Sequence, residues 1–124
     1  MASELRVNTL KDAAGNNSIA TSFVANGSVK SWAILNGTGT ISLDNSLNVA
    51  SVADSGTGDY DFTYSSAFTS DSYCTTAAKN NASDNRANLT LTNRSTTVRG
   101  IKSYENNSAT DCSQVCFQTS GDLA

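Results

Sequence analysis

The sequence has no histidine and no proline, and it is poor in charge. Charged residues make up 15% of the 124 residues, and the formal net charge is −3. Without histidine, a Ser–His or Cys–His nucleophile pair is excluded, and no histidine is present to complete a zinc site. A nucleic-acid surface needs clustered Lys and Arg, which this balance argues against. We therefore expect neither an enzyme nor a protein that holds a metal or cofactor.

Long hydrophobic runs are also missing. No run approaches the roughly 20 apolar residues of a membrane span, and the first residues lack the apolar segment of a signal peptide. We therefore expect no membrane insertion. Hydrophobic residues at 38% are too many for a disordered chain of such low charge. The length suits one domain with a modest core and a short extension, and because the chain begins with Met1 we expect a whole small gene product.

Cysteines are few, and their number is odd. Cys74, Cys112 and Cys116 leave at least one thiol free. On a strand, Cys112 and Cys116 would share a face about 13 Å apart, which is too far for a disulfide. A bridge to Cys74 stays open as the less favoured alternative. Free thiols suit a protein assembled in a reducing cytoplasm.

What the sequence does contain is two-residue alternation in short runs. Asp59–Tyr64 places Tyr60, Phe62 and Tyr64 on one face. Other runs with the same alternation pair Trp32 with Ile34, Ile41 with Leu43, Leu89 with Leu91, and Val115 with Phe117. Gly, Asn, Asp or Ser bounds each run. The pattern predicts an all-β protein, an antiparallel, jelly-roll-like β-sandwich over residues 30–124. Its predicted core contains Trp32, Tyr60, Phe62, Leu89, Leu91, Val115 and Phe117.

Two similar glycine phrases, NGTGT at 36–40 and SGTGDY at 55–60, raise the question of a phosphate-binding loop. Such a loop needs a helix after the glycines, so that the helix N-terminus meets the anion. Strand-like alternation follows both phrases instead, and the P-loop lysine is missing. Since glycine supplies the positive φ of hairpin turns, both phrases are predicted to be turns.

The N-terminal segment, residues 1–29, differs from the rest. It is weakly apolar, with Leu5, Val7, Ile19, Phe23 and Val24, and has no clear partner within the chain. An isolated ribbon of this kind cannot bury its own apolar face. We predict an extended attachment or stalk segment that pairs with copies of itself or docks onto a larger body. The alternative is a mobile arm.

The order of several phrases resembles virion fibre proteins of tailed bacteriophages, especially marine ones. The phrases are LRVNTLKDAAG at 5–15, VANGSVKSW at 24–32, NGTGTI at 36–41 and SLNVASVADSGTGDY at 46–60. The likeness covers residues 4–74 and fades over 75–111, and SQVCF at 113–117 matches the last strand of such proteins. The resemblance implies a homotrimeric appendage of the virion, assembled in the host cytoplasm, whose N-terminal segment contacts other virion proteins. It implies recognition of or attachment to the host surface, with a cell-surface glycan or protein as receptor; the alternative is a structural decoration, head fibre or tail adaptor that binds no receptor.

Two long polar connections are the candidate receptor-binding segments, residues 79–88 and 104–111. Excess loop length on a rigid scaffold is where binding tends to lie, and amides and aromatic rings suit sugars. Asp59 and Asp61 share a strand face, the geometry of a glycosidase pair or a Ca²⁺ site, but a solvated strand face is favoured. The candidate receptor-binding residues are Asn80, Asn81, Asp84, Asn85, Arg86, Tyr104, Asn106 and Asn107.

Overall fold

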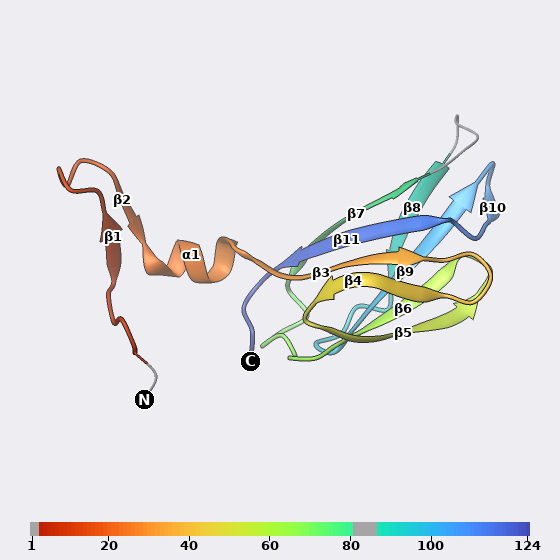
Figure 1. The fold of residues 1–124 in the computed structure, drawn as a ribbon, viewed down its shortest axis with the longest axis horizontal. Coiled ribbons are helices and arrows are strands. Elements are labelled where there is room, and N and C mark those ends of the chain that lie inside the picture. Colours follow the sequence, from red (N-terminus) through yellow and green to blue (C-terminus); the bar gives the residue numbers. More distant parts are fainter. Residues whose placement is uncertain (1–2, 81–86) are drawn as a thin grey trace.

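The alternating runs form strands that pack as two antiparallel sheets in a computed structural model, which describes residues 3–80 and 87–124 (Figure 1). One sheet has the order β4-β3-β11-β7, with β3 (Val29–Asn36), β4 (Ser42–Leu47), β7 (Cys74–Asn80) and β11 (Gln114–Ser120). The other has the order β8-β9-β6-β5, with β5 (Val49–Gly56), β6 (Asp59–Tyr64), β8 (Ala87–Thr92) and β9 (Val98–Glu105). The short β10 (Ser108–Ala109) also pairs with β9. The predicted all-β, antiparallel sandwich is confirmed.

Aromatic rings fill the space between the sheets. Phe62 of β6 and Phe117 of β11 come from opposite sheets, and their ring centroids lie 4.7 Å apart. Tyr64 continues the cluster with edge contacts to Phe68 and Tyr73. Burial of rings of this size dominates the stability of a small core. The predicted burial of Tyr60, Phe62, Val115 and Phe117 is confirmed, and Leu89 and Leu91 are half-buried against the same cluster.

The core face of β3 was predicted wrongly. Ala33 and Leu35 are buried together with Ser31, whereas Trp32 and Ile34 lie half-buried on the outer face. Alternation separates the two faces of a strand but does not say which one faces inward when both carry apolar residues. The inner side is crowded by rings from other strands: a side chain at Gly37 would collide with the Tyr60 hydroxyl. Small inner residues on β3 therefore fit where Trp32 would not.

Both glycine phrases form turns, as predicted. The first joins β3 to β4, and the second is the hairpin turn between β5 and β6. Gly58 has a φ of +65°, and a Cβ there would come within 2.6 Å of the Thr110 carbonyl oxygen. Glycine is therefore required at position 58 both for its backbone conformation and for the close approach of another segment.

An N-terminal arm, residues 3–28, projects from one end of the sandwich (Figure 1). It contains a small hairpin, β1 (Thr9–Lys11) with β2 (Ser18–Ala20), followed by the helix α1 (Thr21–Gly27). In the hairpin turn, Asp12 accepts hydrogen bonds from the Asn17 side chain and from Asn16 N–H, and the Asn17 bond is the main cause of the lowered pKa of Asp12.

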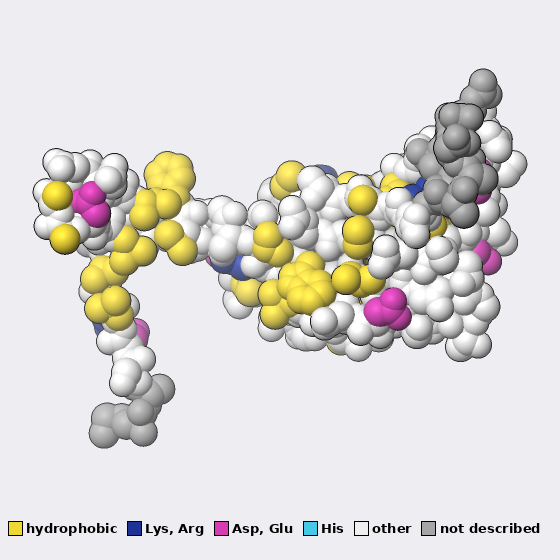
Figure 2. All heavy atoms as spheres, turned by 45° about the horizontal axis from the view of Figure 1, so that its top comes forward, with side chains coloured by type: hydrophobic (Ala, Val, Ile, Leu, Met, Phe, Trp, Pro, Cys, Tyr) yellow, Lys and Arg dark blue, Asp and Glu magenta, His cyan; other side chains and the backbone are white. Residues whose placement is uncertain are grey.

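The predicted extended segment contains, besides its two short strands, the helix α1, which the sequence analysis did not predict. The residues Ser22–Asn26 lack the alternation that would mark them as a strand, and Phe23 and Val24 are neighbouring exposed residues of a short helix. Figure 2 shows hydrophobic side chains gathered along the arm. Within the described residues, no helix is long and apolar enough to cross a membrane.

Candidate functional site

The strand ends opposite the arm bring several polar segments together (Figure 1). β7 ends there at Asn80, and β9 ends at Glu105 and turns into β10. Ser103 N–H donates to Gly58 O at 2.7 Å, and Thr110 N–H donates to Ser103 O at 3.1 Å, so the β5–β6 turn and β10 lie on the same edge of β9. We call residues 37–41, 55–58 and 105–113, with the adjoining strand ends, the distal end.

Four of the predicted receptor-binding residues can be placed, and all four lie at the distal end. Tyr104 is half-buried in β9 between Asn88 and Ala109. Tyr104 and Asn107, with Asn88 and Thr90, line a shallow depression of about 290 Å³. Asn106 is exposed beside it, and Asn80 is exposed at the end of β7. The other four, Asn81, Asp84, Asn85 and Arg86, lie outside the described residues.

The depression is linked to the opposite sheet through Lys79. Its Nζ donates to Tyr104 O at 2.6 Å and to Ser103 Oγ at 2.9 Å. Lys79 belongs to β7 and Tyr104 to β9, so this contact holds the two sheets in register next to the candidate residues. Charge-assisted hydrogen bonds are shorter and stronger than neutral ones. Lys79 therefore fixes the part of β9 that carries the candidate residue Tyr104.

One of the two connections is shorter than predicted. Half of residues 104–111 belong to strands, and the turn between β9 and β10 consists of Asn106 and Asn107 alone. Both have left-handed backbones, with φ of 49° and 65°, which is the geometry of the tightest hairpins. Asparagine is the residue other than glycine that adopts this conformation most readily. The adjacent asparagines were thus a turn signal that the sequence interpretation missed.

Tyr60 fixes the distal segments to the core. Its hydroxyl donates to Gly37 O at 3.0 Å and accepts from Cys112 N–H at 3.3 Å. Asp111 Oδ1 lies 3.5 Å from the same hydroxyl and accepts from Gly58 N–H at 2.7 Å. Burial raises the pKa of Tyr60, so the hydroxyl keeps the proton that it donates. The sequence interpretation placed Tyr60 in the core but missed this polar role.

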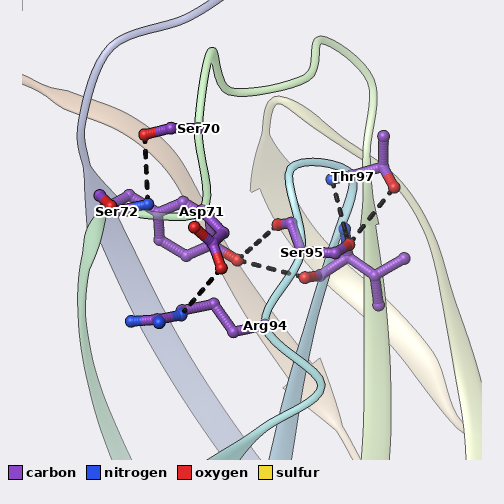
Figure 3. Close-up of polar contacts among 8 residues, drawn as sticks. Ser70, Asp71, Ser72, Arg94, Ser95 and Thr97 are labelled. Atoms are coloured by element: carbon purple, nitrogen blue, oxygen red, sulfur yellow. Dashed lines mark hydrogen bonds and ion pairs between the residues drawn. The ribbon is translucent and has the colours of Figure 1, made fainter.

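The end of the sandwich nearer the arm is closed by its own polar contacts (Figure 3). The Tyr73 hydroxyl donates to Ser95 O at 2.9 Å, and Arg94 Nε lies 3.7 Å from Asp71 Oδ2. Ser95 Oγ accepts from Thr97 N–H at 3.3 Å. These contacts tie residues 65–73 to residues 93–97, two irregular segments whose pairing no short-range sequence pattern predicted. Many polar groups at this end thus satisfy one another, whereas Asn80, Asn106 and Asn107 are exposed to solvent at the distal end.

The acidic pair on β6 is engaged in structural contacts. Asp59 forms an ion pair with Lys102 at 3.2 Å, and this contact raises the pKa of Lys102. Asp61 accepts from Ser55 Oγ at 2.8 Å and from Asn93 Nδ2 at 2.7 Å. Both carboxylates lie on the outer side of β6, opposite its buried rings. Within residues 3–80 and 87–124, no group of three or more Cys, Asp or Glu is placed to hold a metal ion.

The three cysteines are free thiols in three different surroundings. Cys112 is buried, and its thiol donates to Asn80 O and Gln114 O. Cys116 lies on the outer face of β11, and Cys74 is exposed. The expectation that Cys112 and Cys116 share a strand face is wrong, because β11 begins only at Gln114 and Cys112 turns inward before it.

A scan of protein-family models, a search of curated proteins and a search of solved structures find no match to this chain. The features that bear on function are therefore the arrangement of the arm and the distal end and the chemistry of their side chains. The distal depression offers amides, a hydroxyl and a tyrosine ring on a shallow surface. Such groups suit reversible binding of a polar ligand.

Proposed function

We propose that this protein is a virion appendage of a tailed bacteriophage, similar to a tail fibre, which mediates recognition of or attachment to the host surface. The observation that carries the proposal is the division of the molecule into an apolar arm and, at the opposite end, an exposed polar surface. An appendage needs these two ends, because one must join the particle and the other must face the host. The resemblance to phage fibre proteins supports the same function.

In this function the arm is the attachment element. Its exposed apolar side chains can be removed from water only by contact with another surface, either copies of the arm in a homotrimer or other virion proteins. A cyclic trimer is a closed assembly in which one type of contact repeats three times. Assembly takes place in the host cytoplasm, where the reducing environment keeps Cys74, Cys112 and Cys116 as thiols.

The distal end is the receptor-facing element. A sugar presents hydroxyls for the amides of Asn80, Asn106 and Asn107, and an apolar ring face for Tyr104. Each contact is weak, since a shallow polar surface exchanges bonds to water for bonds to sugar at little net gain. Three copies on one appendage, repeated over a particle, raise the overall avidity by about 10²–10⁴ when the sites engage together.

The proposal is tested with particles that carry a distal-end variant, Arg86→Ala with Tyr104→Thr and Asn107→Gly. Threonine keeps the strand preference at position 104, and glycine keeps the left-handed backbone at position 107. The matched control is Asp71→Ala with Arg94→Ala, which removes an exposed ion pair at the other end of the sandwich. We expect slower adsorption to host cells for the distal variant only. If both variants are incorporated normally into particles and adsorb equally, these residues do not bind the receptor.

A second candidate function is that of a structural virion protein, a capsid decoration, head fibre or tail adaptor that binds no receptor. The shallowness of the distal depression favours this alternative, because small-ligand sites are usually deep and mostly apolar. Gold-labelled antibodies against the protein would show in electron micrographs whether it sits on the capsid, the tail or the tail tip. Labelling of the capsid together with unchanged adsorption would favour the structural function, and no labelling of particles would contradict both.

A further inference from the structure

The outer face of the β4-β3-β11-β7 sheet carries an apolar depression of about 410 Å³. Ile34, Cys116 and Ala78 lie side by side across β3, β11 and β7, and Trp32, Gln118 and Thr76 form the next row. These six outward side chains carry no charge, and only two of them are polar. This depression, which we call the Trp32 groove, has no partner within the described chain beyond its own sheet.

The arm, in turn, exposes apolar side chains that have no apolar surface to pack against. Of the eight large hydrophobic residues that are exposed in the described part of the chain, seven lie between positions 5 and 29: Leu5, Val7, Leu10, Ile19, Phe23, Val24 and Val29. Phe23, the one aromatic residue among them, has 72% of its surface exposed. Leu10 and Ile19 lie directly opposite each other on the hairpin. Strands of three residues and a helix of seven are not stable without tertiary contacts. The arm therefore needs an apolar surface to lie against.

The arm cannot readily reach the groove of its own copy. α1 ends at Gly27 and β3 begins at Val29, so Ser28 alone separates the helix from the sheet. The Ser28 N–H donates to Val24 O at 3.2 Å, which continues the helix up to that point. From this junction the arm projects away from the sandwich (Figure 1). Ser28 has an extended backbone, so folding back onto its own sheet would require reversing the chain direction at this single residue, whereas a neighbouring copy can approach freely.

Two exposed apolar residues lie between the arm and the groove, next to the polar residues Ser28 and Lys30. Leu47 of β4 is directly opposite Trp32 and is 48% exposed, and Val29 is exposed at the base of the arm. Figure 2 shows hydrophobic side chains on the arm and in a second patch on the sandwich. Leu47 thus extends the apolar surface of the groove onto β4, and Val29 extends that of the arm to the start of β3.

We propose that the arm of one copy packs into the Trp32 groove of the next, with Phe23 and Val24 of α1 against Trp32, Ile34 and Ala78. This inference deepens the proposed homotrimer and depends on it. An arm donated by each copy to its neighbour is a heterologous contact, which forms a closed ring when the rotation between copies is one third of a turn. The exchange covers both apolar surfaces at once.

A cross-link tests the contact directly, because the groove already contains a thiol. Phe23→Cys is made in the full chain with Cys74→Ser, which removes the exposed thiol and leaves Cys116 in the groove and Cys112 buried. We expect mild oxidation to join the introduced thiol at position 23 of one chain to Cys116 of another, giving covalent dimers and trimers on non-reducing gels. Cys116→Ser in the same background should abolish this ladder, and Ala13→Cys at the hairpin turn, in place of Phe23→Cys, should not produce it.

Fluorescence gives a second measurement without an added cysteine, because Trp32 is the single tryptophan of the chain. In the arm-bound assembly we expect emission at shorter wavelength, which moves to longer wavelength on dilution. Phe23→Ser should give the longer wavelength at all concentrations, while Lys11→Ser, on the polar part of the hairpin, should behave like the unchanged chain.

Four results would overturn the inference. Disulfides between the introduced thiols of two chains that persist in Cys116→Ser would mean that the arms pair with one another. If light scattering shows a trimer but position 23 forms no disulfide with Cys116 or with another position 23, the proposed groove contact is wrong and the proposed trimer is not contradicted. A monomer at micromolar concentration would remove both. A Trp32 emission shift caused by a neutral oligosaccharide, with no change in mass, would assign the groove to sugar binding instead.

Discussion

The sandwich and the arm are built from similar residues but differ in what they bury. Both are rich in Ser, Thr and Asn and low in charge, yet all the aromatic residues except Phe23 belong to the sandwich. Phe62, Phe68 and Phe117 are almost fully buried there, whereas most of the Phe23 surface is exposed. Regular backbone pairing occurs in both regions. This contrast indicates that backbone pairing alone does not make a core, because rings from separate strands must converge on one space.

The largest difference between the two regions is expected in the loss of folding stability when one aromatic ring is removed from each. Phe117→Ala should lower the free energy of unfolding by about 3–5 kcal/mol, because it leaves a cavity beside Phe62. Phe23→Ala should change it by less than about 0.5 kcal/mol at chain concentrations low enough to keep the protein monomeric. Urea unfolding followed by circular dichroism measures both. Similar losses for the two variants would show that the arm is part of the folded core.

A smaller effect is expected from the hydroxyl that fixes the distal segments. Tyr60→Phe removes the partner of Gly37 O and Cys112 N–H while keeping the ring, and it should cost about 1–3 kcal/mol. Tyr104→Phe is the matched control and should stay within about 0.5 kcal/mol. The midpoints of urea unfolding are compared. Equal midpoints for Tyr60→Phe and the unchanged protein would mean that the hydroxyl contributes no net stability.

Alkaline pH should also weaken the sandwich. Burial raises the pKa of Tyr60 and Tyr64 above the value of about 10 that tyrosine has in an unfolded chain. Their contribution to stability is therefore fully present below about pH 10 and is lost as the pH rises above that value, because the unfolded chain releases protons that the folded chain retains. Thermal midpoints measured between about pH 8 and about pH 11 should fall.

The control for this prediction is Tyr64→Phe, in which the fall should be shallower. The arm contains no tyrosine and contributes nothing to the effect. Phenolate absorbance, recorded at the same pH values, should show fewer titrating tyrosines before unfolding than after it. A pH dependence that is unchanged in Tyr64→Phe would contradict the assigned cause.

The smallest expected effect concerns the distal turn. Asn107 has a φ of 65°, so Asn107→Gly should change the stability by less than about 0.5 kcal/mol, because the easier backbone conformation is offset by the greater freedom of the unfolded chain, whereas Asn107→Ala should destabilise the protein by about 1 kcal/mol. Ala13→Gly in the arm is the matched control and should leave the unfolding of the sandwich unchanged. A loss of stability in Asn107→Ala that Asn107→Gly does not share would confirm the tight turn. Equal effects would indicate a relaxed loop, as the sequence interpretation assumed.

The candidate site could be predicted only in part. The sequence interpretation named candidate residues in two separate connections, and the structure places Asn80, Tyr104, Asn106 and Asn107 at the same end of the sandwich. Tyr104, Asn106 and Asn107 were identified, but as a long loop, because the turn potential of two adjacent asparagines was not recognised. The bracing by Tyr60, Lys79 and Asp111 was not predictable, since each contact joins residues at least 23 positions apart.

Local patterns in the amino-acid sequence were enough to predict the all-β fold class, the turns at both glycine phrases, and the inward faces of β6 and β11. Each of these follows from alternation or turn chemistry within a few residues. Packing between distant segments was needed to turn Trp32 outward and Ala33 inward, to separate Cys112 from Cys116, and to leave α1 without a core. For Trp32 the physical reason is that the inner space is limited and rings from distant strands fill it. For Cys112 it is the start of β11 at Gln114, and for α1 it is the departure of the arm from the sandwich.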